Sequence, residues 1–226
     1  MAVLKRLGIV KRTESRMVSF PLTRILTTWF VRLYFQISVW GENSIPAEGP
    51  FVVVANHASF LDPFFIGYAS HRRQVGFMAK EELFKIPLFG NLIRRYDAFP
   101  VKRGQHDLDA VQRFHDFLHQ NKPLLIFPEG TRTLTGELQK AKKGVGLLLY
   151  KAQVPVIPAY VGGTFKSWPK GKLFPKPGKT SVRFGAPLLL ADLYREKPEK
   201  DTYRRIAEKV MESIARLKAM GPSENP

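Results

Sequence analysis

The chain has 226 residues, of which 44% are hydrophobic and 24% charged, a composition that fits one globular domain and excludes a disordered protein. Cysteine is absent, which excludes disulfides, zinc sites built on cysteine and a thiol nucleophile. Lys and Arg number 36 against 19 Asp and Glu, so the formal net charge of +17 predicts an anionic partner: nucleic acid, anionic lipid, or a charged substrate and its carrier.

The first 42 residues are basic and rich in aromatic side chains. After residue 16 the only charges before residue 41 are Arg24 and Arg32, and these divide an apolar stretch into short runs. A membrane-spanning helix needs about 20 nearly uncharged residues. We therefore expect residues 1–42 to form a membrane-associating helical segment that lies in the bilayer interface, with a tilted spanning helix as the alternative.

Three short apolar runs rich in Val, Leu and Ile predict buried strands at residues 51–55, 123–127 and 154–161. Helical patterns at 108–120 and 144–152 precede the second and third of these runs. Strands that alternate with helices predict a single α/β domain over residues 43–226, with a largely parallel central sheet flanked by helices.

A second basic stretch runs from residue 164 to residue 191, with six cations and no acid. The cations are interleaved with Trp, Phe and Leu, a mixture suited to the headgroup boundary of a membrane. A solvated basic surface is the alternative.

Two polar motifs begin where two of the predicted strands end. Residues 56–62 (NHASFLD) follow the first strand, and residues 129–132 (EGTR) follow the second. The carboxyl ends of parallel strands meet at one edge of a sheet, where α/β proteins place ligands. The sequence therefore predicts that both motifs lie together at this edge.

His57 and Asp62 are separated by four residues. On one continuous helix their side chains would point about 140° apart and would not meet. We therefore expect His57 in the turn before a helix and Asp62 in its first turn, with Ser59 as the N-cap. A carboxylate that orients an imidazole makes a general base. The alternative is structural, because Ser59 and Asp62 also fit a capping box.

No protein nucleophile is evident for such a base to activate. The chain has no Cys and no Gly-x-Ser-x-Gly motif, and Ser59 is only two residues from His57. The simplest chemistry is direct attack by a substrate hydroxyl on an activated acyl donor, either a thioester or another activated ester.

The second motif has the residue types of a phosphate site. Gly130 predicts a tight turn, Thr131 supplies a hydroxyl and Arg132 supplies a forked guanidinium. Further cations follow at Lys140, Lys142 and Lys143. The alternative is an ordinary surface turn.

His115 and His119 are four residues apart on a predicted helix, a spacing compatible with metal ligation. No clear third ligand accompanies them, and the Glu of the zinc-protease motif is missing. We therefore expect a solvated helix face here, and neither a metal nor a cofactor.

Four blocks, in this order and spacing, resemble the glycerolipid acyltransferase family. They are NHASFLD (Asn56–Asp62), KEEL (Lys80–Leu83) followed by Pro87, Gly90 and Arg103, FPEGTR (Phe127–Arg132), and VPVIP (Val154–Pro158). The resemblance covers roughly half of the chain. One departure is Ala141, where the family often has an aromatic residue.

By this resemblance the chain is an O-acyltransferase, with His57 as the catalytic base and Asp62 as its orienting partner. The resemblance implies that the acceptor's glycerol and phosphate bind to Glu129, Gly130, Thr131 and Arg132, with help from Lys80 and Arg103. It implies transfer from an acyl-carrier-protein or coenzyme A thioester to lysophosphatidic acid, giving phosphatidic acid. We expect this activity on an anionic membrane surface, at the cytoplasmic face of the cell inner membrane.

The alternatives are the same transfer to another lysolipid, such as a lyso-ornithine lipid, and a non-catalytic protein that binds lipid or nucleic acid. Nucleic-acid binding is not expected, because the sequence has no recognisable binding module and its cations gather around the apolar amino terminus. A protein that only bound lipid would have no evident role for His57 and Asp62.

Overall fold

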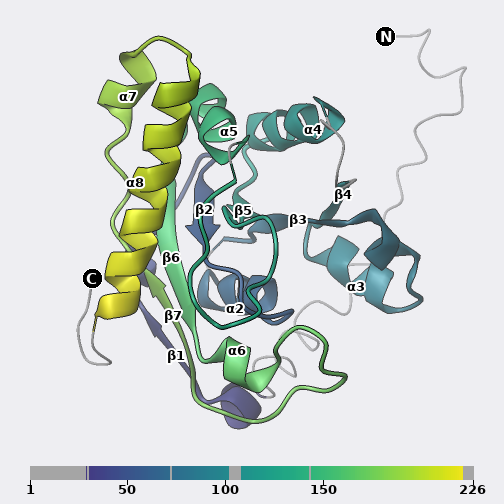
Figure 1. Ribbon diagram of the computed structural model, residues 1–226. Helices are drawn as coiled ribbons and strands as arrows, with labels where there is room; N and C mark the ends of the chain where they lie inside the picture. Colours follow the sequence, from purple (N-terminus) through teal and green to yellow (C-terminus); the bar gives the residue numbers. More distant parts are fainter. Residues whose placement is uncertain (1–28, 30, 72, 102–107, 143, 221–226) are drawn as a thin grey trace, which may run out of the picture.

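A seven-stranded sheet forms the centre of the molecule in the computed structural model, which describes residues 29, 31–71, 73–101, 108–142 and 144–220 (Figure 1). The strand order is β1-β7-β6-β2-β5-β3-β4. The strands are β1 (Ile37–Trp40), β2 (Val52–Ala55), β3 (Gly76–Lys80), β4 (Phe99–Val101), β5 (Leu124–Ile126), β6 (Val156–Gly162) and β7 (Thr180–Phe184).

Five neighbouring strands, β6, β2, β5, β3 and β4, are parallel to one another. β7 is antiparallel to β6, and β1 is parallel to β7, so these two strands run in the opposite direction. The predicted α/β class with a largely parallel sheet is confirmed. Because β1 and β7 are reversed, their first residues lie at the same edge of the sheet as the last residues of the other five strands.

Strand β2 shows why the sheet needs cover on both faces. All four of its residues are buried. Val53 and Ala55 pack into one apolar cluster, and Val52 and Val54 pack into the other, because successive side chains on a strand point to opposite faces. An apolar run of this kind is typical of a strand buried in a parallel sheet.

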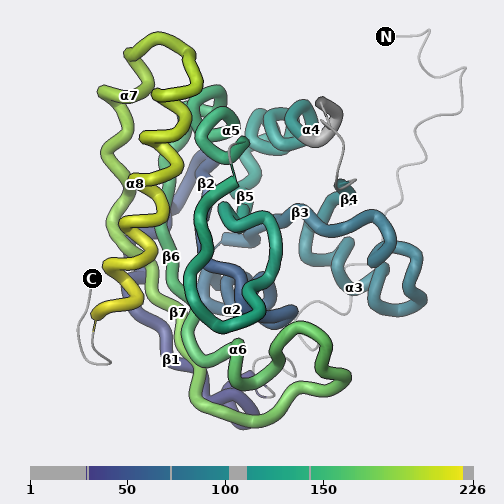
Figure 2. Tube along the Cα trace, viewed as in Figure 1, coloured from purple at the N-terminus to yellow at the C-terminus, as the bar shows by residue number. Residues whose placement is uncertain are grey.

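Helices cover both faces of the sheet. The helical elements are η2 (Glu42–Ser44), α2 (Asp62–Ala69), η3 (Glu81–Lys85), α3 (Phe89–Arg95), α4 (Leu108–His119), α5 (Gly144–Ala152), α6 (Thr164–Ser167), α7 (Ala191–Arg195) and α8 (Lys200–Ala219). α2 packs into the cluster that contains Val53, whereas α4, α5 and α8 pack into the cluster that contains Val52. Figure 2 follows the path of the chain in the same view, with α7 and α8 at the left and α3 at the right.

Most of the predicted membrane-associating segment, residues 1–42, lies outside the described residues. Its last part does not: residues 31–35 are helical, Phe35 packs in the core, and β1 already belongs to the sheet. The division of the chain at residue 42 stays a prediction. Within the part of the chain that the structure describes, no helix combines the length and the apolar character needed to cross a membrane.

Candidate active site

The two polar motifs meet at the carboxyl edge of the sheet. β2 and β5 are adjacent and parallel, with Val54 beside Ile126, so residues 56–62 and 127–133 leave the sheet side by side. The backbone N–H of Thr133 donates to the carbonyl oxygen of His57 at 2.8 Å, which joins the two loops directly. The arrangement expected from strand order is therefore present.

His57 and Asp62 form a hydrogen-bonded pair. Helix α2 begins at Asp62, and His57 lies in the turn before it. The His57 Nδ1 atom is 2.9 Å from Asp62 Oδ2. The same carboxylate oxygen accepts the backbone N–H groups of Ala58 and Ser59, each at 2.7 Å. Asp62 is thus held by the turn that it orients, and it leaves the Nε2 atom of His57 as the nitrogen available to a substrate.

The expectation that Ser59 is the N-cap of this helix is wrong. The N-cap residue is Leu61, which makes no side-chain capping bond. The Ser59 hydroxyl instead accepts the N–H of Leu61 at 3.2 Å and donates to the carbonyl oxygen of Trp168 at 2.8 Å. This second bond ties the turn that carries His57 to the segment after α6, a long-range contact that the local sequence does not reveal.

Asn56 fixes the end of β2, a role that the motif alone did not indicate. Its side-chain amide donates to the carbonyl oxygen of Val161 at 3.0 Å, and its side-chain oxygen accepts the N–H of Val161 at 2.7 Å. One side chain thus makes the two bonds of a backbone ladder, so β2 stays fixed against β6 up to the residue before His57.

The imidazole of His57 is also fixed from the side. Its ring stacks on the ring of Phe127, with 3.9 Å between the ring centres and 12° between the planes. The side chain of His57 is 13% exposed, so the ring is mostly covered and still reachable. Stacking and the Asp62 bond together restrict the ring to one orientation.

Glu129 lies behind His57 and is 1% exposed. One of its carboxylate oxygens accepts the backbone N–H of His57 at 3.1 Å, and the other accepts the side-chain amide of Gln139 at 2.8 Å. Burial raises the pKa of the Glu129 carboxyl, and the two hydrogen bonds oppose that shift. Gln139 also donates to the carbonyl oxygen of Thr131 at 3.2 Å. The sequence did not indicate Gln139, because it lies ten residues after Glu129 in a polar loop and belongs to none of the motifs.

Gly130 makes the tight turn that the sequence predicts. Its φ of +67° lies in the left-handed region, and a Cβ atom there would lie 2.9 Å from the Cγ atom of Lys142. Beyond this turn, the guanidinium carbon of Arg132 lies 4.1 Å from the centre of the Phe60 ring. Arg132 is therefore positioned beside the turn that carries His57.

Gly130→Ala is expected to lower both stability and activity. Backbone strain costs about 1–2 kcal/mol, and the added methyl group pushes on Lys142. Gly49→Ala is the matched control: Gly49 has a φ of +75° before β2, and a Cβ atom added there would meet no described atom within 4 Å. Thermal unfolding should shift in both variants, whereas kcat/KM should fall only in Gly130→Ala. Equal kcat/KM in the two variants would contradict a role for this turn.

The remaining predicted site residues are less closely grouped. Lys80 is the exposed last residue of β3, at the same edge of the sheet, with β5 between it and β2. Arg103 lies outside the described residues, as does Lys143. His115 and His119 lie on α4, and burial lowers the pKa of His115. Among the described residues, no three His, Asp or Glu side chains are grouped as a metal would require.

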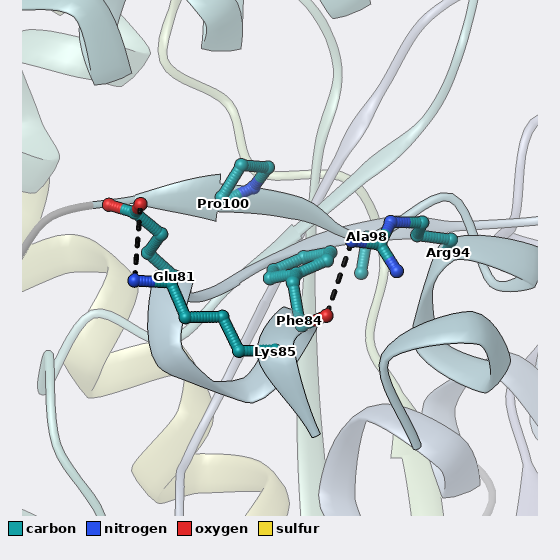
Figure 3. Close-up of a pocket in the computed structure, with 6 residues that line it drawn as sticks. All are labelled: Glu81, Phe84, Lys85, Arg94, Ala98 and Pro100. Atoms are coloured by element: carbon teal, nitrogen blue, oxygen red, sulfur yellow. Dashed lines mark hydrogen bonds and ion pairs between the residues drawn. The ribbon is translucent and has the colours of Figure 1, made fainter. Parts of the chain in front are cut away.

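A pocket of about 460 Å³ lies at η3, α3 and β4 (Figure 3). Its lining residues are Glu81, Phe84, Lys85, Arg94, Ala98 and Pro100. Arg94 donates to the carbonyl oxygen of Phe84 at 3.2 Å. Glu81 follows Lys80 in the chain, but none of the lining residues belongs to the network around His57. The pocket is therefore not part of the candidate site.

The structure thus brings an oriented His–Asp pair and a Gly-Thr-Arg turn together at one edge of an α/β sheet. The chain belongs to the acyltransferase family, whose family model matches residues 36–162.

Individual relatives carry a more specific name. The 1-acyl-sn-glycerol-3-phosphate acyltransferase of Bacillus subtilis (strain 168) is 28% identical over 181 residues, which cover 80% of this chain and 87% of that protein. A protein of the same name from Cocos nucifera is 32% identical over 65% of this chain, which spans about half (48%) of that longer relative. The crystal structure of the 1-acyl-sn-glycerophosphate (LPA) acyltransferase PlsC from Thermotoga maritima superimposes with a TM-score of 0.67 at 27% identity, covering 90% of this chain and 84% of that one.

Proposed function

We propose that this acyltransferase moves a fatty acyl group from an acyl thioester to the free hydroxyl of 1-acyl-glycerol-3-phosphate, giving phosphatidic acid. The observation that carries the proposal is the His57–Asp62 pair, held at 2.9 Å where β2 ends. The names of the relatives support the acceptor, because the Bacillus subtilis and Thermotoga maritima proteins match most of the chain.

The chemistry is a direct attack. The Nε2 atom of His57 takes the proton of the acceptor hydroxyl as its oxygen bonds to the thioester carbonyl carbon. Asp62 holds the Nδ1 proton and stabilises the imidazolium that forms. The tetrahedral intermediate then breaks its C–S bond, and the thiolate leaves with the proton from Nε2. The products are the ester and the free thiol, with His57 neutral again.

The cations and donors beside His57 bind the acceptor phosphate. Arg132 can give two parallel hydrogen bonds to a phosphate, and Thr131 adds a hydroxyl. Gly130 shapes the turn that places these donors, and its own N–H donates to the carbonyl oxygen of Phe127 at 2.9 Å. Lys80 and Arg103 complete the predicted set. The donor is an acyl carrier protein or coenzyme A thioester, and the net charge of +17 suits the acidic surface of the carrier as well as the phosphates of coenzyme A.

In this proposal Glu129 holds the backbone of His57 in place and does not bind the acceptor. Both of its carboxylate oxygens bond to protein groups, and 1% exposure leaves little of it to meet an acceptor. Glu129→Gln should lower kcat about tenfold, because the new amide N–H₂ would face the amide N–H₂ of Gln139 and loosen the turn of His57. The KM for the acceptor should stay within about twofold. A raised KM with unchanged kcat would instead mean that Glu129 contacts the acceptor, as the family resemblance implies.

The proposed place of action is the cytoplasmic face of the cell inner membrane. Support comes from the basic, aromatic-rich residues 1–42 and from an acceptor that is itself a membrane lipid. Protease treatment of intact and opened cells that carry a terminal tag tests this: the tag should be digested only after opening.

A panel of acceptors tests the substrate assignment. Purified protein is given one labelled acyl thioester with 1-acyl-glycerol-3-phosphate, a lyso-ornithine lipid or monoacylglycerol. Transfer to 1-acyl-glycerol-3-phosphate should exceed transfer to monoacylglycerol by about 100-fold, because Arg132 and the turn at Gly130 would have no phosphate to bind. Preferred transfer to the lyso-ornithine lipid would replace the acceptor and keep the chemistry. Running the panel with both thioesters identifies the donor.

A further inference from the structure

We propose that residues 168–179, the loop that connects α6 to β7, dock on an anionic lipid bilayer by inserting Leu173 and Phe174 between the headgroups. This docking loop would be a membrane contact separate from residues 1–42. The inference rests on the proposed function only in that a lipid acceptor gives the protein a reason to meet the bilayer with this edge.

The tip of the docking loop presents two adjacent large apolar side chains to solvent. Leu173 is 78% exposed and Phe174 is 74% exposed. Neighbouring exposed side chains of this size are costly in water and suit insertion at a membrane interface. Scattered single apolar residues are normal on a surface, but a pair at the tip of a loop is a localised feature.

Hydrogen bonds at the base of the docking loop hold this tip outward. The indole N–H of Trp168 donates to the carbonyl oxygen of Lys172 at 2.8 Å, and the N–H of Lys176 donates to the carbonyl oxygen of Ser167 at 2.8 Å. The loop therefore closes on itself below Leu173 and Phe174. A pre-formed loop loses less conformational entropy when it binds.

The docking loop is joined to other segments that expose apolar side chains. The Tyr34 hydroxyl donates to the carbonyl oxygen of Pro175 at 3.1 Å, and the N–H of Gly178 donates to the carbonyl oxygen of Tyr34 at 3.3 Å, which fixes the helical residues 31–35 and exposed Leu33 beside it. The loop after β5, which exposes Leu134, reaches α6, where Gly136 lies against Phe165. All three segments lie at the edge of the sheet that carries His57. β5 ends at this edge, and the reversed strands β1 and β7 begin there (Figure 1).

The charges around the tip select an anionic bilayer. Five lysines on α6 and the docking loop are all exposed, and the sequence has no acid from residue 164 to residue 191; the lysines are Lys166, Lys170, Lys172, Lys176 and Lys179. Lysines bind lipid phosphates while their stems lie along apolar surface. An acidic protein or a nucleic acid would also match the lysines. A bilayer is favoured because it places an apolar layer directly behind a continuous anionic surface, which fits two apolar side chains at a tip surrounded by lysines.

The docking loop is also linked to the catalytic turn. The bond from Ser59 to the carbonyl oxygen of Trp168 joins the two, and the ring of Phe60 lies 5.8 Å from that of Trp168. Docking would therefore place the His57 edge against the headgroup layer, where the hydroxyl of a lysolipid lies.

Phe174→Trp tests the insertion directly. Leu189→Trp is the matched control, since Leu189 is 84% exposed and follows β7 at the opposite edge of the sheet. Each variant is mixed with phosphatidylglycerol–phosphatidylcholine vesicles with or without brominated acyl chains, and the emission of wild type is subtracted. The emission of the indole added at position 174 should shift to the blue on unbrominated vesicles and should be quenched on brominated vesicles. The emission of the indole added at position 189 should show neither change. Quenching at neither position, or at both equally, would overturn the proposal. A blue shift of Phe174→Trp on addition of an acidic acyl carrier protein without vesicles would overturn the choice of a lipid partner.

A double variant separates docking from catalysis. Leu173→Ser with Phe174→Ser should weaken binding to these vesicles about tenfold, and Leu189→Ser should not. With substrate dispersed in detergent, the double variant should transfer acyl groups within about twofold of wild type. Vesicle binding that is unchanged in the double variant would contradict the docking loop. If wild type transferred no acyl groups in detergent but Phe174→Trp were quenched, the proposed function would fail and the docking loop would stand.

Discussion

His57→Ala is expected to lower kcat for acyl transfer by about 1,000-fold, the middle of the range for a general base. Alanine cannot take the proton from the acceptor hydroxyl, so the attacking oxygen would have to lose it to water. The proposed phosphate contacts of Arg132 and Thr131 would remain, and the KM for the acceptor should therefore change little.

The His57→Ala variant should still fold. The bonds that hold the catalytic loops together at this position use the backbone of His57, whose N–H reaches Glu129 and whose carbonyl oxygen accepts the N–H of Thr133. His119→Ala is the control, because His119 is exposed at the end of α4. Both variants should show the unfolding transition of wild type, and only His57→Ala should lose activity. A folded His57→Ala protein with normal kcat would rule out His57 as the base.

Asp62→Asn is expected to lower kcat by about 100- to 1,000-fold with little change in stability. The asparagine oxygen can replace Oδ2 and accept the same three donors, from His57, Ala58 and Ser59. The amide N–H₂ then takes the place of Oδ1, a buried atom with no partner among the described residues. The imidazole keeps its orientation and loses only the negative charge that stabilises its protonated form.

Asp62→Ala should differ from Asp62→Asn in stability. Alanine leaves the N–H groups of Ala58 and Ser59 without their buried acceptor, at about 1–3 kcal/mol for each group. Denaturant unfolding should therefore rank wild type and Asp62→Asn close together and Asp62→Ala well below them, while both variants lose kcat. If Asp62→Asn kept wild-type kcat, the charge of Asp62 would have no part in catalysis.

The sequence was sufficient for the central part of the fold and for the pair at the site. The run at residues 51–55 is apolar because β2 is covered on both faces, and a buried parallel strand leaves this pattern in the chain. The spacing of His57 and Asp62 excluded one helix and required the turn that the structure contains. Both inferences depend on local geometry, which a single sequence records.

The other features depend on contacts between distant segments. β7 has the sequence TSVRF, which includes the buried residue Arg183. The guanidinium carbon of Arg183 lies 4.8 Å from the centre of the Trp40 ring of β1. Because this strand contains a charged residue, its hydropathy does not predict a buried strand. The reversed direction of β1 and β7 likewise has no local signal. Ser59 shows the same limit, because its hydroxyl bonds to Trp168, 109 residues away.

Transfer from a labelled acyl thioester to 1-acyl-glycerol-3-phosphate by the purified protein is the most direct test of direct attack by the acceptor. Products are separated as lipid and protein, with and without the acceptor. Labelled phosphatidic acid should form only with the acceptor present, and the protein itself should carry no label at any time. Label that accumulates on the protein before the acceptor is added, or the absence of phosphatidic acid with either thioester, would contradict it.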